Sequence, residues 1–164
     1  AAVEDDDPVL YLEHKALYRR LRAELPPDTH RTPIGKARIA KPGTDATVVT
    51  YGSGVPLALD VADRVAADVE VLDLRTVWPL DADAILESVG RTSRVLVLQE
   101  ASRSSGAAAQ VLSLIAREGF ELLDAPPALH AAPDTPVPFA PELEDAYLPS
   151  LESTTAALEE LLAY

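Results

Sequence analysis

The stretch "VLVLQEASRSSGAAAQ", residues 95–110, joins an apolar run to a polar turn and then to an alanine-rich segment. The apolar run shows no alternation with polar residues, which is typical of a parallel strand buried on both faces. The serines and the glycine that follow it, and then the alanines, predict that a helix begins there. A strand, a turn and a helix in this order indicate an α/β protein. In an open α/β sheet, the carboxyl end of a strand is where ligands bind.

The same pattern continues on both sides of this stretch. A strand followed by a helix at this spacing predicts βαβ units with right-handed crossovers. The sequence therefore predicts an α/β fold with three layers, α/β/α, and a mostly parallel, doubly wound sheet. A proline-rich loop is expected between the last strand and the last helix. The predicted strands are residues 46–51, 69–74, 94–99 and 127–132, and the predicted helices are about 55–67, 82–90, 105–118 and 151–162, the last with Leu151, Leu158, Leu161 and Leu162 on one side.

Residues 1–31 differ from the rest, so the predicted division is 1–31 and 32–164. The run "PVLYLEH", residues 8–14, is strand-like, and a basic segment, 15–25, and a linker, 26–33, follow it. A lone strand has no sheet of its own and needs partners. We therefore expect residues 9–12 to pack poorly or to pair with another copy.

The composition limits the class of protein. Hydrophobic residues make up 48% of the 164, which suits a packed core, and no apolar run approaches the roughly 20 residues that a membrane span needs. The net charge of −13 is unfavourable for binding nucleic acid. We therefore expect no nucleic-acid or membrane partner. The absence of cysteine is consistent with a cytoplasmic protein. The acidity either serves solubility or forms a patch for a basic protein partner.

The segment "YGSGVPLALD" resembles part of a dinucleotide-binding turn. Gly52 and Gly54 give the pattern G-x-G, and Asp73 lies where a ribose-binding carboxylate would be. However, Leu57 replaces the third glycine, which allows close packing of helix and strand. Pro56 simply suits the first turn of a helix. An ordinary connection between strand and helix is therefore the favoured interpretation.

The polar turn after residue 98 has two interpretations. Its three serines, at positions 102, 104 and 105, are good N-caps, and an ion pair between Glu100 and Arg103 would fix the turn. A catalytic serine would need a base and an orienting acid. Of the three histidines, only His130 lies in or near the predicted sheet. We therefore favour a structural turn, with an anion site or a contact with another chain as alternatives.

The sequence gives no set of residues that indicates a metal or cofactor site. Asp5, Asp6 and Asp7 are consecutive and would point in different directions. Asp81 and Asp83 are typical of the acidic start of a helix, with Asp81 as its N-cap. We therefore assign no catalytic, cofactor-binding or metal-binding residue.

A set of motifs in order along nearly the whole chain resembles a known family. The family is the C-terminal half of the β subunit of thiamine-diphosphate-dependent 2-oxo acid dehydrogenases, the E1 components of pyruvate and branched-chain complexes. The ordered set, rather than any single motif, is specific. It comprises "DPVLYLEHKALYR", "PIGKARI", "VTYGS", "VEVLDLRTVWPLD", "ILESVGRTSRVLVLQEA", "LLDAPP" and "APDTPVPFAPELEDAYLPS".

This resemblance implies a transketolase C-terminal domain at 32–164, preceded at 1–31 by the last strand of a pyrimidine-binding domain and a linker. The family's cofactor-activating glutamate and its catalytic β-subunit histidine lie in the N-terminal half and match no position here. The chain is then expected to be an inactive fragment that binds no cofactor. The complete enzyme, with thiamine diphosphate and Mg, oxidatively decarboxylates a 2-oxo acid and transfers the acyl group to a lipoyl group on E2. The chemistry of the carbanion belongs to the cofactor.

The resemblance also implies partners. These are the E1 α subunit or the α region of a fused chain, a second E1 β, and the small basic subunit-binding domain of E2. In some members that domain contacts a carboxylate in an L-x-A-P segment and the C-terminal carboxylate. The matching positions here are Asp124 and Tyr164. We expect salt-sensitive binding there, whereas an ordinary polar residue ending a loop is the alternative for Asp124.

The resemblance bears on the polar turn as well. The family usually has His-Glu-Ala, then Arg and a pair of glycines. Here Gln99 replaces the histidine and Ser105 replaces one glycine, while Glu100, Arg103 and Gly106 match. Since glutamine cannot act as a base, the resemblance favours a structural turn that faces a neighbouring subunit.

Two other functions remain open. One is a non-enzymatic binding module that keeps this fold as a docking surface. The other is part of a related thiamine enzyme, such as a transketolase or a deoxyxylulose-phosphate synthase, against which "DTPVPFAP" and "YLPS" argue by resemblance. The choice between pyruvate and a branched-chain 2-oxo acid also stays open, because the family's substrate pockets lie largely outside this part.

Overall fold

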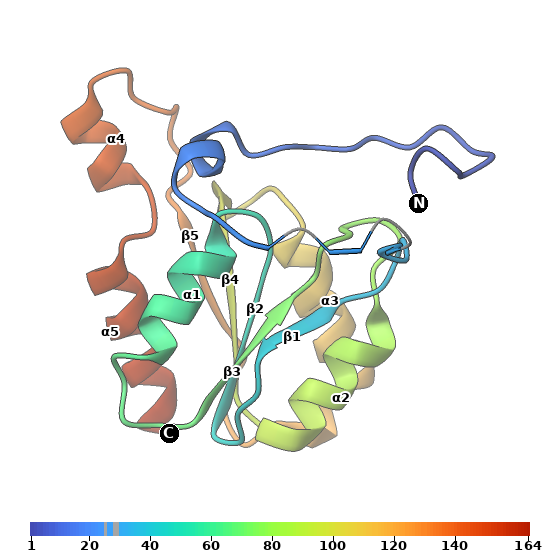
Figure 1. Cartoon of the computed structure of the whole chain (residues 1–164). Helices are drawn as coiled ribbons and strands as arrows, with labels where there is room; N and C mark the ends of the chain where they lie inside the picture. Colours follow the sequence, from blue (N-terminus) through green and yellow to red (C-terminus); the bar gives the residue numbers. More distant parts are fainter. Residues whose placement is uncertain (25, 28–29) are drawn as a thin grey trace.

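The computed structural model describes residues 1–24, 26, 27 and 30–164. This part of the chain contains one five-stranded sheet, in the order β1-β3-β2-β4-β5, between two layers of helices (Figure 1). The predicted three-layer α/β/α fold with a mostly parallel sheet is confirmed. The strands are β1 (Arg38–Lys41), β2 (Ala46–Thr50), β3 (Val69–Asp73), β4 (Val95–Ser102) and β5 (Ala128–Ala132); the helices are α1 (Gly54–Ala62), α2 (Ala82–Thr92), α3 (Ala108–Glu118), α4 (Pro141–Tyr147) and α5 (Leu151–Leu162), with 3-10 turns η1 (Lys15–Arg19) and η2 (Phe120–Leu122).

The core lies on both faces of the sheet. Helices α1 and α5 cover one face, and α2 and α3 cover the other (Figure 1). Alternate residues of β2 enter the two halves of the core: Val48 packs with α1 and α5, whereas Val49 packs with α2 and α3. Burial on both faces explains why the central strands are apolar along their length. Polar groups are therefore expected mainly where the strands begin and where they end.

Strand β1 and helix α4 lie in parts of the chain for which the sequence predicted neither a strand nor a helix. β1 pairs antiparallel with β3 at one border of the sheet. Just before it, the Ala37 amide donates to the Asp81 carboxylate at 3.0 Å, and Lys36 Nζ lies 3.3 Å from it. Burial alone raises the pKa of Asp81, but these hydrogen bonds outweigh it, so its pKa lies below the usual range. Helix α4 begins at Pro141, which suits a first turn.

Asp81 occupies the predicted N-cap position of α2, but its carboxylate makes no capping hydrogen bond. The contacts with residues 36 and 37 take its place. Helix α1 ends at Ala62, earlier than predicted, and the Arg64 amide donates to the Val61 carbonyl, three residues back, in a tightened last turn. Both differences come from hydrogen bonds that helix periodicity does not specify.

Gln99 determines where α3 begins. The sequence predicted a helix from about residue 105 with a serine as N-cap, but the N-cap is Ala107, and no side chain at that position caps the helix. Gln99, buried at the end of β4, accepts a hydrogen bond from the Ala108 amide at 3.0 Å. Its amide nitrogen donates to the carbonyls of Ser102, at 3.0 Å, and Ser105, at 2.7 Å. One side chain thus closes the turn and caps the helix, because a buried amide must satisfy both of its polar ends.

The strand predicted at residues 8–14 does not form. These residues have no regular secondary structure, and the segment lies along the top of the sheet in Figure 1. Leu10 is 91% exposed and Leu12 is 85% exposed. The reason is the expected one: a strand without a neighbouring sheet has no partner for its backbone groups. Leu25, Asp28 and Thr29, which belong to the predicted basic segment and linker, lie outside the described residues.

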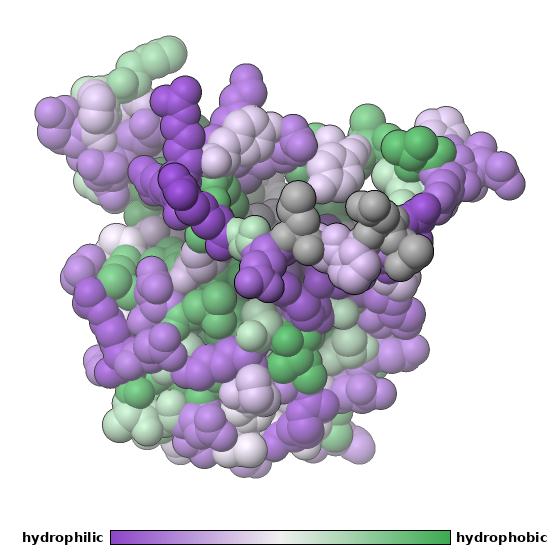
Figure 2. Space-filling model, in the orientation of Figure 1, coloured by the Kyte–Doolittle hydropathy of each residue, from purple (hydrophilic) through white to green (hydrophobic). Residues whose placement is uncertain are grey.

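Within the described ranges, no helix is both long and apolar enough to cross a membrane. On the face that Figure 2 shows, hydrophilic residues dominate and hydrophobic residues form small separate areas.

Gly106→Ala should destabilise the protein more than Gly52→Ala. Both glycines have a positive φ, +87° and +59°. A Cβ at Gly106 would lie 2.6 Å from Gln99 Oε1, whereas a Cβ at Gly52 would meet nothing within 4 Å. In urea unfolding, we expect a loss of about 1 kcal/mol for Gly52→Ala from the backbone conformation alone. For Gly106→Ala we expect at least about 2 kcal/mol, because the clash is added. Equal losses would contradict the role given to Gln99.

Hydrogen exchange should separate the N-terminal segment from the sheet. In a dilute monomeric sample, the amides of residues 9–12 should exchange without protection, since their side chains are exposed and no strand forms. The amides of β2 are the internal reference, because every residue of that strand is buried. Uniform protection of residues 9–12 at low concentration would contradict this prediction.

Candidate functional site

The polar turn after residue 98 lies where the parallel strands of the sheet end; we call this side of the sheet its carboxyl edge. The predicted ion pair between Glu100 and Arg103 does not form. Instead, Glu100 Oε2 lies 2.9 Å from His14 Nε2, on the N-terminal segment. Arg103 donates its backbone N–H to the Ala132 carbonyl at 2.9 Å, and its side chain is exposed. The turn thus connects β4 with β5 and also contacts the N-terminal segment.

The serines of the turn have structural partners. The Ser104 amide and hydroxyl both donate to the Asp134 carboxylate, at 2.9 and 2.8 Å, and these bonds hold the pKa of Asp134 below its usual range. His130 lies 3.0 Å from Ser153 of α5, not beside a serine of the turn. Burial, and then the charge of Arg103, lower the pKa of His130. In the described part of the chain, no serine of this turn is hydrogen-bonded to a histidine, so the His14–Glu100 pair is not completed to a serine, a base and an acid.

Asp73, which a nucleotide-binding turn would use to bind a ribose, is buried and already hydrogen-bonded within the protein. It accepts from Arg38 Nη2 at 3.1 Å and from the Arg75 amide at 3.1 Å. Gly54 is needed for packing, because a Cβ there would lie 2.0 Å from Thr50 Oγ1. An ordinary connection between strand and helix accounts for this turn without a nucleotide.

The opposite, amino edge of the sheet carries an open hollow of about 480 Å³. Here Asp124, just before β5, faces the end of α2 and the start of β4 across the hollow. Leu162, two residues before the last residue of the chain, also lines it. We call this the amino-edge hollow; it is lined by Thr44, Asp45, Ala67, Arg91, Thr92, Ser93, Arg94, Asp124 and Leu162.

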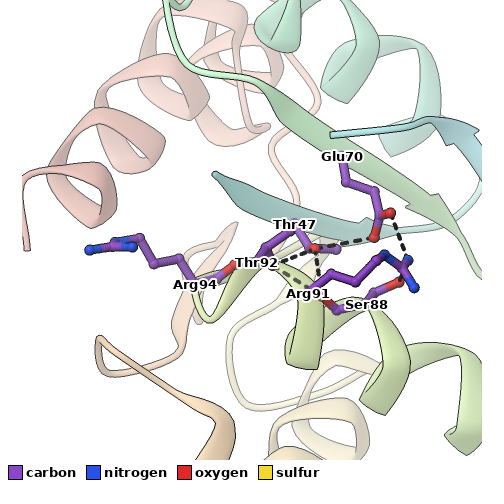
Figure 3. Close-up of polar contacts among 6 residues, drawn as sticks. All are labelled: Thr47, Glu70, Ser88, Arg91, Thr92 and Arg94. Carbon is purple, nitrogen blue, oxygen red and sulfur yellow. Dashed lines mark hydrogen bonds and ion pairs between the residues drawn. The ribbon is translucent and has the colours of Figure 1, made fainter. Parts of the chain in front are cut away.

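A buried carboxylate lies behind this hollow. Glu70 of β3, whose side chain is 2% exposed, pairs with Arg91 at 2.7 Å and accepts from Thr47 Oγ1 at 3.2 Å. Thr92 Oγ1 lies 2.8 Å from Thr47 Oγ1, and Arg91 also donates to Ser88 (Figure 3). Because Thr47, Glu70, Ser88, Arg91 and Thr92 all bond to one another, the network ties the end of α2 to the sheet. It thereby fixes one wall of the hollow.

The side chain of Arg94 points away from Glu70 and Arg91 (Figure 3). Its Nη1 lies 3.9 Å from Asp124 Oδ2. The side chain of Asp124 is 66% exposed, while its backbone amide is fixed by a hydrogen bond to the Ser93 carbonyl at 2.9 Å. Asp124, which was predicted to contact a partner, therefore has a fixed backbone and a carboxylate that is accessible from solvent.

Tyr164, the second predicted contact, follows the end of α5 and is 72% exposed. It lies two residues beyond Leu162, which lines the hollow together with Asp124. The tertiary structure thus brings toward one edge of the sheet two positions that are 40 residues apart in the sequence.

The described residues form no group of three or more His, Asp or Glu side chains that could hold a metal ion. In the amino-edge hollow, Asp45 already accepts from the Asp68 amide at 2.7 Å and Asp124 faces Arg94. These residues do not fit a magnesium ion with a diphosphate.

Sequence reasoning missed the residues that shape this hollow. Glu70 interrupts the buried run "VEVLDL", and Arg91 and Arg94 lie in "GRTSR". A charged residue inside an otherwise apolar strand is a signal for a buried ion pair. Its partner, however, is 21 residues away in the chain and becomes evident only in the fold.

Comparison with known proteins supports the resemblance found in the sequence. Residues 35–153 match the family model "Transketolase, C-terminal domain". The chain is 42% identical to an acetoin:2,6-dichlorophenolindophenol oxidoreductase subunit beta of Bacillus subtilis, over 99% of this chain and 48% of that protein. It is 40% identical to a 2-oxoisovalerate dehydrogenase subunit beta of the same organism, over 100% and 51% of the two chains. It is 42% identical to a pyruvate dehydrogenase E1 component subunit beta of Staphylococcus epidermidis, over 97% and 51%.

The chain spans about half the length of these relatives. Among solved structures, a split-gene transketolase described as an inactive beta4 tetramer matches with a TM-score of 0.73, covering 86% of this chain and 46% of the other. At 23% identity, that match supports the fold alone. The family model covers most of the sheet and its helices, and the α/β/α arrangement agrees with it. The chain therefore belongs to the transketolase C-terminal domain family.

Proposed function

We propose that this chain is the C-terminal assembly and docking part of the β subunit of a thiamine-diphosphate-dependent 2-oxo acid dehydrogenase E1. The complete enzyme would oxidatively decarboxylate a 2-oxo acid and transfer the acyl group to lipoyl-E2. The observation that carries this proposal is about 40% identity to β subunits of such enzymes over nearly the whole chain. The absence of cysteine is consistent with work in the cytoplasm.

Thiamine diphosphate and Mg would be held elsewhere in the complete enzyme. In the hollow, Asp45 accepts a hydrogen bond from the Asp68 amide and Asp124 lies 3.9 Å from the Arg94 cation, and the described residues gather no metal-ligating group. The part of the reaction that falls to this chain is therefore to hold other parts of the enzyme in place. By itself it would be inactive.

Residues 1–31 would belong to the preceding domain as its last strand and linker. Their apolar side chains, above all Leu10 and Leu12, would then be covered by the sheet of that domain. The His14–Glu100 contact joins this segment to the turn at the end of β4. Glu100, Arg103 and Gly106 would thus form a structural turn between the domains, close to a neighbouring subunit.

Asp124 and Tyr164 would contact the subunit-binding domain of E2, and the chain would also meet an E1 α subunit and a second E1 β. The net charge of −13 favours a basic partner, and Asp124 is exposed beside the end of the chain. The relatives are named for pyruvate, 2-oxoisovalerate and acetoin. Residues outside this chain would choose among such substrates.

The function is tested on the complete protein that carries this chain, assembled with its α subunit and E2. We expect thiamine-diphosphate-dependent acylation of the lipoyl group of E2 with at least one 2-oxo acid. Pyruvate, branched-chain 2-oxo acids and acetoin are compared as substrates. No activity with any 2-oxo acid, from an enzyme that assembles and binds thiamine diphosphate, would contradict the proposal.

Asp124→Lys should weaken binding of the isolated E2 subunit-binding domain to the assembled E1. At low salt, calorimetry should show a loss of about ten-fold or more, because the substitution reverses a charge that faces a basic partner. The loss should shrink at high salt, where screening weakens the attraction. The matched control is Asp145→Lys on α4, which makes the same change at another exposed position. Unchanged affinity for Asp124→Lys at low salt would contradict the docking site.

A further inference from the structure

Of the four ionic side chains that line the amino-edge hollow, two make no hydrogen bond through their side chains within the described structure. Arg91 is engaged by Glu70 at 2.7 Å and by Ser88 at 2.9 Å. Asp45 accepts from the Asp68 amide at 2.7 Å. Arg94 and Asp124, by contrast, meet each other at 3.9 Å, which is beyond hydrogen-bond distance. A partner that docks here would therefore interact first with this pair.

The Arg94 side chain has unused hydrogen-bonding capacity. Its Nε is buried and has no hydrogen-bond partner among the described residues. Its backbone is fixed, since the Thr47 amide donates to the Arg94 carbonyl at 2.8 Å. Because Nε is closed off from solvent, a docking partner would meet the outer nitrogens of the guanidinium: Nη1 faces Asp124 at 3.9 Å, and the Arg94 side chain is 27% exposed. A partner cation on Asp124 would also compete with Arg94 for this carboxylate.

We propose that Arg94 is a specificity-determining residue of the docking site: it binds a carboxylate of the E2 subunit-binding domain while Asp124 binds an adjacent cation of the same domain. The inference rests on the docking role proposed above. The loose contact between Arg94 and Asp124 is exchanged for two ion pairs between the chains. The planar guanidinium suits a carboxylate, because it donates two parallel hydrogen bonds. The partner surface is therefore recognised by a cation and an anion side by side, not by basic charge alone.

The test measures binding of the isolated E2 subunit-binding domain to the complete assembled E1 by calorimetry. Arg94→Ala should weaken binding by about five- to thirty-fold, as expected for the loss of one well-placed ion pair. Arg94→Lys keeps the charge but not the paired donors. Its affinity for the E2 domain should lie between those of the original enzyme and Arg94→Ala. The control is Arg117→Ala on α3, whose side chain is 75% exposed, lies 3.8 Å from its neighbour Glu118 and does not line the amino-edge hollow. That variant should bind like the original enzyme.

Unchanged or tighter binding of Arg94→Ala would overturn the inference. Tighter binding would mean that Arg94 only competes with the partner cation for Asp124. If Asp124→Lys weakens binding and Arg94→Ala does not, the docking site stands and the role of Arg94 fails. If neither has an effect, the docking site itself fails.

A second measurement covers the case in which Arg94→Ala impairs folding. The carboxylates of the E2 domain are neutralised one at a time, Asp to Asn or Glu to Gln, and tested against unaltered E1 and Arg94→Lys. We expect one of these changes to weaken binding to unaltered E1, and to have a smaller effect with Arg94→Lys. Equal effects with both proteins, or no effect of any neutralisation, would overturn the inference.

Discussion

Burial of the central strands on both faces is the constraint on which the rest of the structure depends. Because β2, β3 and β4 are covered by helices on either side, a polar group inside them must find its partner within the protein. Glu70 finds Arg91, and Gln99 finds the first amide of α3 and the carbonyls of its own turn. Each of these solutions fixes the path of the chain at one edge of the sheet.

The two edges consequently differ in character. At the carboxyl edge, Gln99 closes a tight turn and Glu100 reaches the N-terminal segment, so the polar groups there connect parts of the protein. At the amino edge, the network around Glu70 leaves an open hollow in which Asp124 and Arg94 are only loosely paired. The second edge is where we propose that another protein docks.

In the proposed docking, net charge determines which sign of partner is attracted, and the positions of particular side chains determine which partner is selected. A net charge of −13 attracts any basic partner and accelerates encounter, without selecting one. Selection needs side chains with fixed positions and unsatisfied bonds. Arg94 meets this requirement, since its backbone is anchored by Thr47 while its partly exposed guanidinium lies 3.9 Å from Asp124, too far for a hydrogen bond.

The sequence by itself determined the layers, the parallel sheet and the last helix, because apolar runs and helix periodicity are local signals. It also pointed to Gly106, whose position in the turn only a glycine fills without strain. Tertiary structure decided what depends on distant partners: the start of α3 at Ala108, the antiparallel strand β1, and the pairing of Glu100 with His14. It also left residues 8–14 without a strand. A hydrogen bond or ion pair between residues far apart in the chain leaves no periodic trace in the sequence, so these features appear only when the fold brings the partners together.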